Sequence, residues 1–202
     1  TVVATRKDEG LLGSKLLVIQ PMKADRTPAG KPLVAVDAVG AGAGEDVFYG
    51  EYVHLTSGSP DFEPTHPKDD QFYRIIDVRN PSKPTEVGRW WYPGTRKGDS
   101  APPPPRHPKF DGGYRPHNTN VYPQKPDRAY VGYIDGGAWI LDISDKSKPK
   151  PVGHLQYSPP YNGFTHTVLP LIERGYLIIS DECVKDNGED WPKLTWVVDA
   201  RV

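Results

Sequence analysis

The most constraining feature of this sequence is a unit that occurs twice and starts a third time. An apolar run that ends in aspartate leads into Ser-Lys-Pro and closes with Val-Gly, at residues 72–88 and again at residues 138–153. The aspartate, proline and glycine keep the same spacing in both copies: Asp77, Pro84 and Gly88, then Asp142, Pro149 and Gly153. The apolar run starts again at Leu194 and reaches Asp199. Units repeated in this way predict stacked copies that share a core.

Further strands precede the aspartate strand in each copy. Residues 50–56, 128–135 and 174–181 align on a tyrosine and are rich in β-branched and aromatic residues, as strands are. Residues 117–123 and 166–171 predict one more strand in the second and third copies. With the strand after the Ser-Lys-Pro turn, a unit has four antiparallel strands, which is typical of a propeller blade. The first copy lacks the innermost strand and the third lacks the outer one. We therefore predict an all-β fold with a partial β-propeller of about three incomplete four-stranded blades.

The composition supports this fold class and excludes several kinds of partner. The 202 residues include 23 Pro and 20 Gly, which suit the turns between many short strands. The 5 Trp and 11 Tyr argue against disorder. A net charge of −1 gives no footprint for nucleic acid, and no apolar run has the length of a membrane span. A single cysteine, Cys183, excludes an internal disulfide.

Residues 1–46 have a different pattern. Two strand-like runs at 15–20 and 32–37 are joined by a polar loop, and a glycine-rich segment follows at 38–45. A strand that runs into Gly-x-Gly is how dinucleotide-binding turns begin. The third glycine of that fingerprint is replaced by Glu45, and no amphipathic helix follows, so a structural loop is favoured over nucleotide binding.

The blocks at residues 4–7, 11–13, 15–21 and 34–45 resemble the EutN/CcmL family of pentameric vertex proteins from bacterial microcompartment shells. The resemblance implies a small β-barrel-like segment, a non-enzymatic shell role, and a glycine loop that lines the central opening of a pentamer. We therefore expect a vertex-like domain at 1–46, followed by a propeller-like region at 47–202.

Residues 75–78 and 140–143, with their Ser-Lys-Pro turns, resemble the LVIVD repeat, which is predicted to form β-propellers. The segments at 115–118, 163–170 and 180–182 are similar to that family too. The biochemical role of the family is poorly defined, so this resemblance implies a fold more than a function.

Two histidines are the sharpest candidates for chemistry. His117 and His166 occupy the same place in successive units, at the start of the innermost strand. Inner strands line the channel of a propeller, so both imidazoles are predicted to converge there, with Asp181 or Glu182 completing a site for a divalent transition metal. The alternative is that each histidine caps its strand by bonding the backbone of a neighbouring blade. No tight ligand spacing such as His-Glu-x-x-His strengthens the metal hypothesis.

Other conspicuous residues have structural interpretations. The repeat aspartates, Asp77, Asp142 and Asp199, suit Asx-turns at strand ends. Cys183 is predicted to be a buried, inert thiol rather than a nucleophile, because no base or oxyanion hole accompanies it. The aromatic run at 90–92 predicts packing between blades. The polyproline segment at 101–106 predicts a stiff loop, or a docking segment for an aromatic groove.

Three functions follow from these patterns. The leading hypothesis is a non-catalytic binding or scaffolding repeat module with a metal or small ligand at the channel histidines. The alternatives are a shell vertex component and, last, a metal-dependent oxidase or hydrolase. Other protein chains are expected as partners, since three blades do not close a ring. The vertex resemblance implies a bacterial, cytoplasmic microcompartment, whereas the propeller resemblance implies export. A fragment or chimera is also consistent with two incomplete patterns in one chain.

Overall fold

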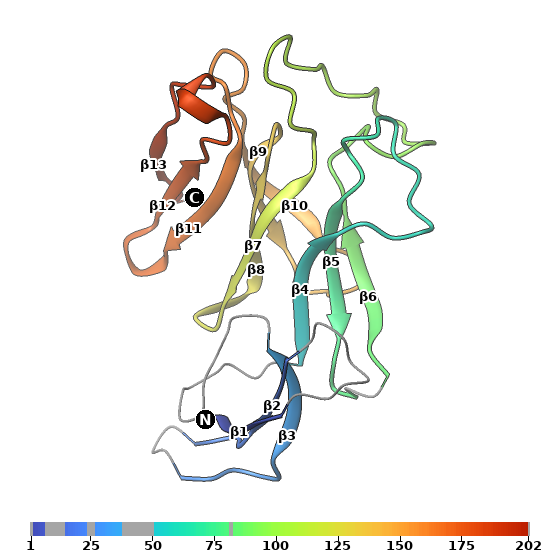
Figure 1. Ribbon diagram of the computed structural model, residues 1–202, viewed down its shortest axis with the longest axis vertical. Helices are drawn as coiled ribbons and strands as arrows, with labels where there is room; N and C mark the ends of the chain where they lie inside the picture. Colours follow the sequence, from blue (N-terminus) through green and yellow to red (C-terminus); the bar gives the residue numbers. More distant parts are fainter. Residues whose placement is uncertain (1, 7–14, 24–26, 38–50, 81–82, 202) are drawn as a thin grey trace. The chain divides into compact units, whose positions relative to one another are not determined.

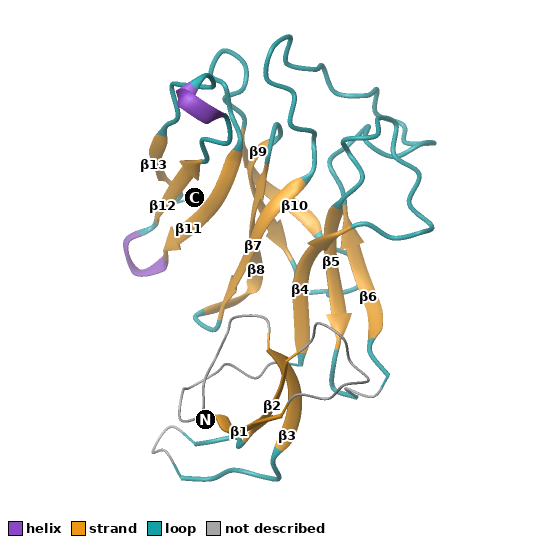
Figure 2. Cartoon of the chain, in the orientation of Figure 1, coloured by secondary structure: helices purple, strands orange, loops and turns teal. Residues whose placement is uncertain are grey.

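The computed structural model describes residues 2–6, 15–23, 27–37, 51–80 and 83–201 (Figure 1). Apart from two short 3-10 turns, Ile172–Arg174 and Asp186–Gly188, the regular structure of these residues is β-strand (Figure 2). The strands form four antiparallel sheets, which confirms the all-β prediction. Within the described residues no sheet closes into a barrel and no ring of blades is complete.

Contacts divide the chain into two compact units. The N-terminal unit comprises residues 1–51 with 78–83, and the C-terminal unit comprises residues 52–77 with 84–202. Each unit has its own sheets, so we describe each by itself.

The N-terminal unit contains one sheet with the strand order β1-β2-β3. Its strands are β1 (Val2–Arg6), β2 (Lys15–Ile19) and β3 (Leu33–Asp37). The pairing of β2 with β3 is the predicted hairpin. Leu17 and Ile19 are buried and Val18 is only partly so, as expected where one face of a strand packs inward. The glycine-rich segment at 38–45 lies outside the described residues.

The C-terminal unit contains three sheets that follow the predicted strand order. The strands are β4 (Tyr52–Ser57), β5 (Phe72–Asp77) and β6 (Thr85–Trp90) in the first sheet; β7 (Pro116–Tyr122), β8 (Lys125–Tyr133), β9 (Gly137–Asp142) and β10 (Lys150–Leu155) in the second; and β11 (Thr165–Leu171), β12 (Tyr176–Asp181) and β13 (Thr195–Asp199) in the third. Strand β7 packs against β4 on one side and against β11 on the other (Figure 1). The first strands of successive sheets are therefore neighbours.

Each repeat aspartate is held in the same register. Asp77 lies opposite Tyr52, Asp142 opposite Arg128, and Asp199 opposite Tyr176. Arg128 is thus the counterpart of the two tyrosines, and the sequence alignment on Tyr130 was wrong by two residues. Because the offset is even, the side chains still point to the same faces of the sheet.

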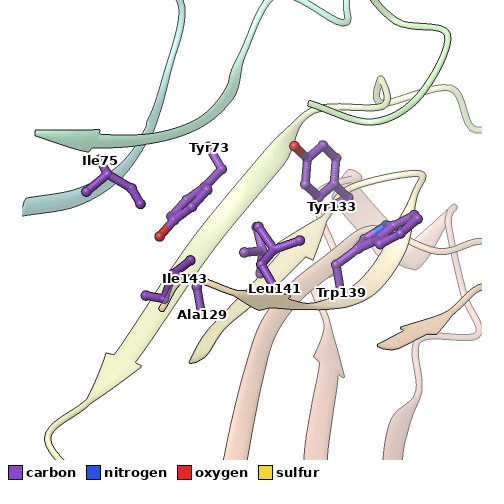
Figure 3. Close-up of a cluster of buried hydrophobic side chains, with 8 residues drawn as sticks. Tyr73, Ile75, Ala129, Tyr133, Trp139, Leu141 and Ile143 are labelled. Atoms are coloured by element: carbon purple, nitrogen blue, oxygen red, sulfur yellow. The ribbon is translucent and has the colours of Figure 1, made fainter. Parts of the chain in front are cut away.

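The middle sheet is buried on both faces where residues 129–133 of β8 pair with residues 137–141 of β9, which is why these two stretches are apolar. One face packs on the first sheet in a core of Tyr73, Ile75, Ala129, Val131, Tyr133, Trp139, Leu141 and Ile143 (Figure 3). The other face packs on the third sheet in a core of Tyr130, Ala138, Tyr157, Val168, Leu177 and Ile179. Trp90 contacts the rings of Tyr133 and Trp139, which confirms that the aromatic run packs between sheets.

The Val-Gly that closes each repeat is a β-bulge. The register shifts by one residue at Val87, between Glu86 and Gly88, and in the same way at Val152, between Pro151 and Gly153. A bulge places two residues opposite one and increases the local twist. The repeated sequence thus encodes an irregularity of the last strand, which the sequence pattern did not predict.

Candidate functional site

Both candidate histidines are themselves the extra residue of a β-bulge. In β7, Pro116 pairs with Tyr133 and Asn118 with Gly132, which leaves His117 unpaired. In β11, Thr165 pairs with Asp181 and Thr167 with Ser180, which leaves His166 unpaired in the same way. Bulges re-aim side chains and are frequent beside functional sites. The structure therefore places the two imidazoles at equivalent, irregular points of neighbouring strands.

The two imidazoles and one carboxylate converge. The ring centroids of His117 and His166 are 4.2 Å apart. The Oε2 atom of Glu182 lies 3.5 Å from Nε2 of His117 and 3.7 Å from Nε2 of His166. One ligand atom from each of the three residues lies within 4.8 Å of the others. The side chains are 34, 32 and 40% exposed, so the cluster is partly open to solvent.

Neighbouring polar side chains contact the other ring nitrogen of each histidine. Asn118 Oδ1 lies 3.3 Å from Nδ1 of His117. Thr167 Oγ1 lies 2.6 Å from Nδ1 of His166. The amide nitrogen of Asn118 lies 3.2 Å from the same ring nitrogen and donates to the Thr167 hydroxyl at 3.1 Å. These ring contacts involve side chains rather than the backbone of a neighbouring sheet, which disfavours the strand-cap alternative. Each histidine is followed directly by such a polar residue, which is the sequence signal that was missed.

The backbone around the cluster permits the close approach. Gly132 has no side chain where a Cβ atom would lie 2.7 Å from the carbonyl oxygen of His166. Phe164 has a φ of 69°, which is uncommon for an aromatic residue, and its ring contacts His117 with centroids 5.9 Å apart. The Phe164 carbonyl accepts a hydrogen bond of 3.0 Å from the N–H of Glu182. A strained residue thus connects the two sides of the cluster.

Asp181, the other predicted carboxylate, is engaged elsewhere. Its carboxylate accepts hydrogen bonds from the Tyr157 hydroxyl at 2.5 Å and from the N–H of Leu194 at 3.2 Å. Burial raises the pKa of Asp181, although both bonds favour the charged form. The structure therefore brings Glu182 to the histidines, and Asp181 holds the third sheet to its loops.

The repeat aspartates and the cysteine can now be placed. Asp142 accepts the N–H of Ser144 at 2.9 Å, and Asp199 accepts the N–H of Arg201 at 3.0 Å, as predicted for Asx-turns. Cys183 is exposed, so the prediction of a buried thiol was wrong. Its thiol lies on a loop after β12 and donates to Asp190 at 3.0 Å. That carboxylate raises the pKa of Cys183, which keeps the thiol protonated and unreactive.

A hollow of about 320 Å³ borders the cluster through Phe164. Lysine side chains, including Lys68, Lys109 and Lys193, line it together with Asp111 and Asp135. No sequence pattern indicated this hollow, because its residues come from five separate loops. Its mixed charges and solvent opening define no single ligand.

The fold and the cluster define a class of protein: an all-β chain whose C-terminal unit consists of stacked antiparallel sheets, with paired histidines on equivalent strands of two of them. Comparison with known proteins adds the families. Residues 1–77 match the family described as "Ethanolamine utilisation protein EutN/carboxysome", and residues 70–91 and 127–156 match the LVIVD repeat. The first match passes the predicted boundary at residue 46 and overlaps the second, so that boundary stays a prediction. Neither LVIVD match includes His117 or His166.

Two curated relatives resemble the N-terminal part. "Bacterial microcompartment shell vertex protein GrpN" of Rhodospirillum rubrum (strain F11) is 51% identical over 47 residues, which is 23% of this chain and 53% of the relative. "Bacterial microcompartment shell vertex protein EutN" of Salmonella typhimurium (strain LT2) is 40% identical over 58 residues, 29% of this chain and 52% of the relative. The chain thus spans about half the length of each relative. Among the helices of the described residues, none has the length and apolar character needed to cross a bilayer.

Proposed function

We propose that this protein is a structural component of a bacterial microcompartment shell, in which the N-terminal part forms pentamers and the C-terminal unit is a non-catalytic binding module. The observation that carries the proposal is the match of residues 1–77 to the vertex family, with half of the aligned residues identical in one relative. The paired strands β1, β2 and β3 support it, because a vertex barrel is built from such strands.

The C-terminal unit supplies the second half of the proposal. Its three sheets stack face to face, and the middle one has the four-strand order of a propeller blade. We read these sheets as blades that other protein chains complete. The boundary between the two parts is proposed near residue 46, before the first strand of the blades. Under this proposal the protein is located in the cytoplasmic microcompartment rather than exported.

Native mass spectrometry of the purified full chain tests the oligomeric state. The expected species has five times the mass of the chain. Val34 on β3 is 58% exposed although it is apolar, which suits an interface between copies in the N-terminal part. Val34→Glu is expected to shift the pentamer to monomer. Val152→Glu is the matched control, since Val152 on β10 is 55% exposed but lies in the C-terminal unit.

A wild-type monomer at every concentration tested would overturn the shell proposal. A pentamer that Val152→Glu disrupts and Val34→Glu leaves intact would place the assembly surface in the C-terminal unit instead. That result would favour the second candidate, a self-assembling repeat scaffold without a vertex role, for which the two LVIVD matches are the supporting observation.

A further inference from the structure

We propose that His117, His166 and Glu182 bind one divalent transition-metal ion of the kind represented by Zn²⁺. The site lies wholly in the C-terminal unit and does not depend on the shell proposal. Its three residues come from β7, β11 and the loop after β12, which are brought together by the stacking of two sheets.

The distances separate this interpretation from hydrogen bonding. A hydrogen bond between imidazole and carboxylate spans about 2.7–3.2 Å between heavy atoms. The observed separations between Glu182 Oε2 and the two Nε2 atoms are 3.5 and 3.7 Å, which are too long. Ligands held about 2.1 Å from a tetrahedral metal lie about 3.4 Å from one another. Both separations to Glu182 thus match ligands around a central ion rather than hydrogen-bonded partners, and all three ligand atoms lie within 4.8 Å of one another.

The surrounding polar side chains contact the Nδ1 atoms and leave the Nε2 atoms facing Glu182. With Nδ1 of His117 protonated, it donates to Asn118 Oδ1. Nδ1 of His166 faces two groups, the Thr167 hydroxyl at 2.6 Å and the donor amide nitrogen of Asn118 at 3.2 Å, and it is protonated in the tautomer that donates to Thr167 Oγ1. Nε2 of His117 then presents a lone pair toward Glu182, and Nε2 of His166 does so in the tautomer whose Nδ1 donates to Thr167. Metal-binding histidines characteristically donate the other ring N–H to such a partner, which fixes the tautomer and the ring orientation. Asn118 and Thr167 are therefore positioning residues.

The donor set selects the class of ion. Two neutral imidazoles and one carboxylate suit Zn²⁺, Co²⁺, Ni²⁺, Cu²⁺ and Fe²⁺, whereas Ca²⁺ and Mg²⁺ prefer oxygen ligands. The thiol of Cys183, next in sequence to Glu182, donates a hydrogen bond to Asp190 and is therefore not among the proposed metal ligands. Three protein ligands on a partly exposed cluster leave a fourth coordination position for water.

Cobalt titration of the full chain, after dialysis against a chelator, tests the site. We expect one equivalent of Co²⁺ per chain, with the visible absorption of a four-coordinate ion, and competition by Zn²⁺. His117→Ala, His166→Ala and Glu182→Gln are each expected to weaken binding by roughly 100-fold or more, because each removes one of three ligands. His66→Ala is the matched control, since it removes an imidazole outside the cluster and should leave binding unchanged.

Further measurements keep the outcome decisive. Thermal melting without metal is expected to be the same for wild type and Glu182→Gln, which shows that lost binding is not lost folding. Wild-type melting should rise with Zn²⁺, and melting of Glu182→Gln should not. Binding by Glu182→Gln and by the double variant His117→Ala, His166→Ala at wild-type affinity would overturn the site. So would wild-type protein that takes up no cobalt. Native mass spectrometry of the same samples reports the pentamer separately, so failure of either proposal is distinguishable.

Discussion

The carboxyl group of Asp135 lies buried at the turn between β8 and β9 and accepts the N–H groups of Gly112 and Gly113 at 2.8 and 2.7 Å. Burial, together with the neighbouring carboxyl of Asp111, raises its pKa from 3.8 to about 7. The folded chain therefore keeps a proton between about pH 4 and 7 that the unfolded chain has released. This stabilisation is complete below pH 4 and is lost as the pH rises through 7.

We expect the free energy of unfolding to fall with pH across this window, with a slope of up to about 1.4 kcal/mol per pH unit. Asp135→Asn should flatten the slope, since an amide cannot titrate. Urea unfolding at a series of pH values measures it. Asp70→Asn, a change at an exposed carboxylate, is the control. An equal slope in Asp135→Asn and wild type would contradict the prediction.

Arg106 is the second residue on which local order depends. Its guanidinium donates to both carboxylate oxygens of Asp69 at 2.8 Å and to Asp111 at 2.5 Å. Asp69 is fully buried, so the loss of Arg106 leaves its carboxylate with the N–H of Tyr114 at 2.8 Å but no cation. Arg106→Ala should destabilise the C-terminal unit by about 3–5 kcal/mol.

Lys97→Ala is the comparison for Arg106, because Lys97 forms an exposed ion pair with Glu63. It should cost less than about 1 kcal/mol. Both variants are measured by denaturant unfolding. If Arg106→Ala lowers the free energy of unfolding no more than Lys97→Ala does, the ion pair of Arg106 with the buried Asp69 does not stabilise the loops that carry them.

At the scale of residues, the sequence predicted contacts between side chains that occupy equivalent positions of the repeat, and few other contacts. His117 and His166 came together because they occupy equivalent positions of two units. Asp69 and Arg106 come from loops 37 positions apart, outside any repeat, so no pattern related them. The choice of Glu182 over Asp181 was decided by Tyr157, whose hydroxyl takes the Asp181 carboxylate.

At the scale of elements, the Val-Gly bulge offers a matched pair of variants. A Cβ atom on Gly88 would lie 1.9 Å from the carbonyl oxygen of Lys146, whereas one on Gly153 would meet only the Ile140 side chain, at 3.3 Å or more. Backbone cannot give way as a flexible side chain can. Gly88→Ala should therefore destabilise the C-terminal unit by about 1–3 kcal/mol or more, and Gly153→Ala by much less. Melting temperatures of the two variants provide the test, and equal shifts would show that the two bulges are not packed differently.

The strands themselves were largely predictable, since alternation, turn residues and the repeat agreed on each of them. The irregularities were not. A bulge moves one residue out of the ladder without changing the composition of the strand, so His117 and His166 read as ordinary strand residues. The same limit explains the two-residue error at Tyr130, because an even offset preserves the alternation.

At the scale of the whole molecule, the chain divides into two compact units, and both clusters of buried apolar residues among the described residues lie in the C-terminal one. The C-terminal unit is continuous through its middle sheet, both faces of which are buried, so its three sheets should lose structure together. Neither cluster includes a described residue of the N-terminal sheet. Residues 78–83 cluster with the N-terminal unit, and the domain boundary expected near residue 46 stays a prediction.

Two compact units predict two unfolding transitions in differential scanning calorimetry of the full chain. Leu141, fully buried in the core between the first two sheets, should be required for one transition, and Leu17, buried in β2, for the other. Leu141→Ala is expected to lower the free energy of unfolding of the C-terminal unit by about 2–5 kcal/mol and so to lower the temperature of its transition. Leu17→Ala is expected to do the same, by a similar amount, for the N-terminal unit alone. Because pentamer formation would stabilise the N-terminal unit alone, raising the protein concentration should move only the transition that Leu17→Ala affects. A single transition that shifts in both variants would mean that the two units unfold as one.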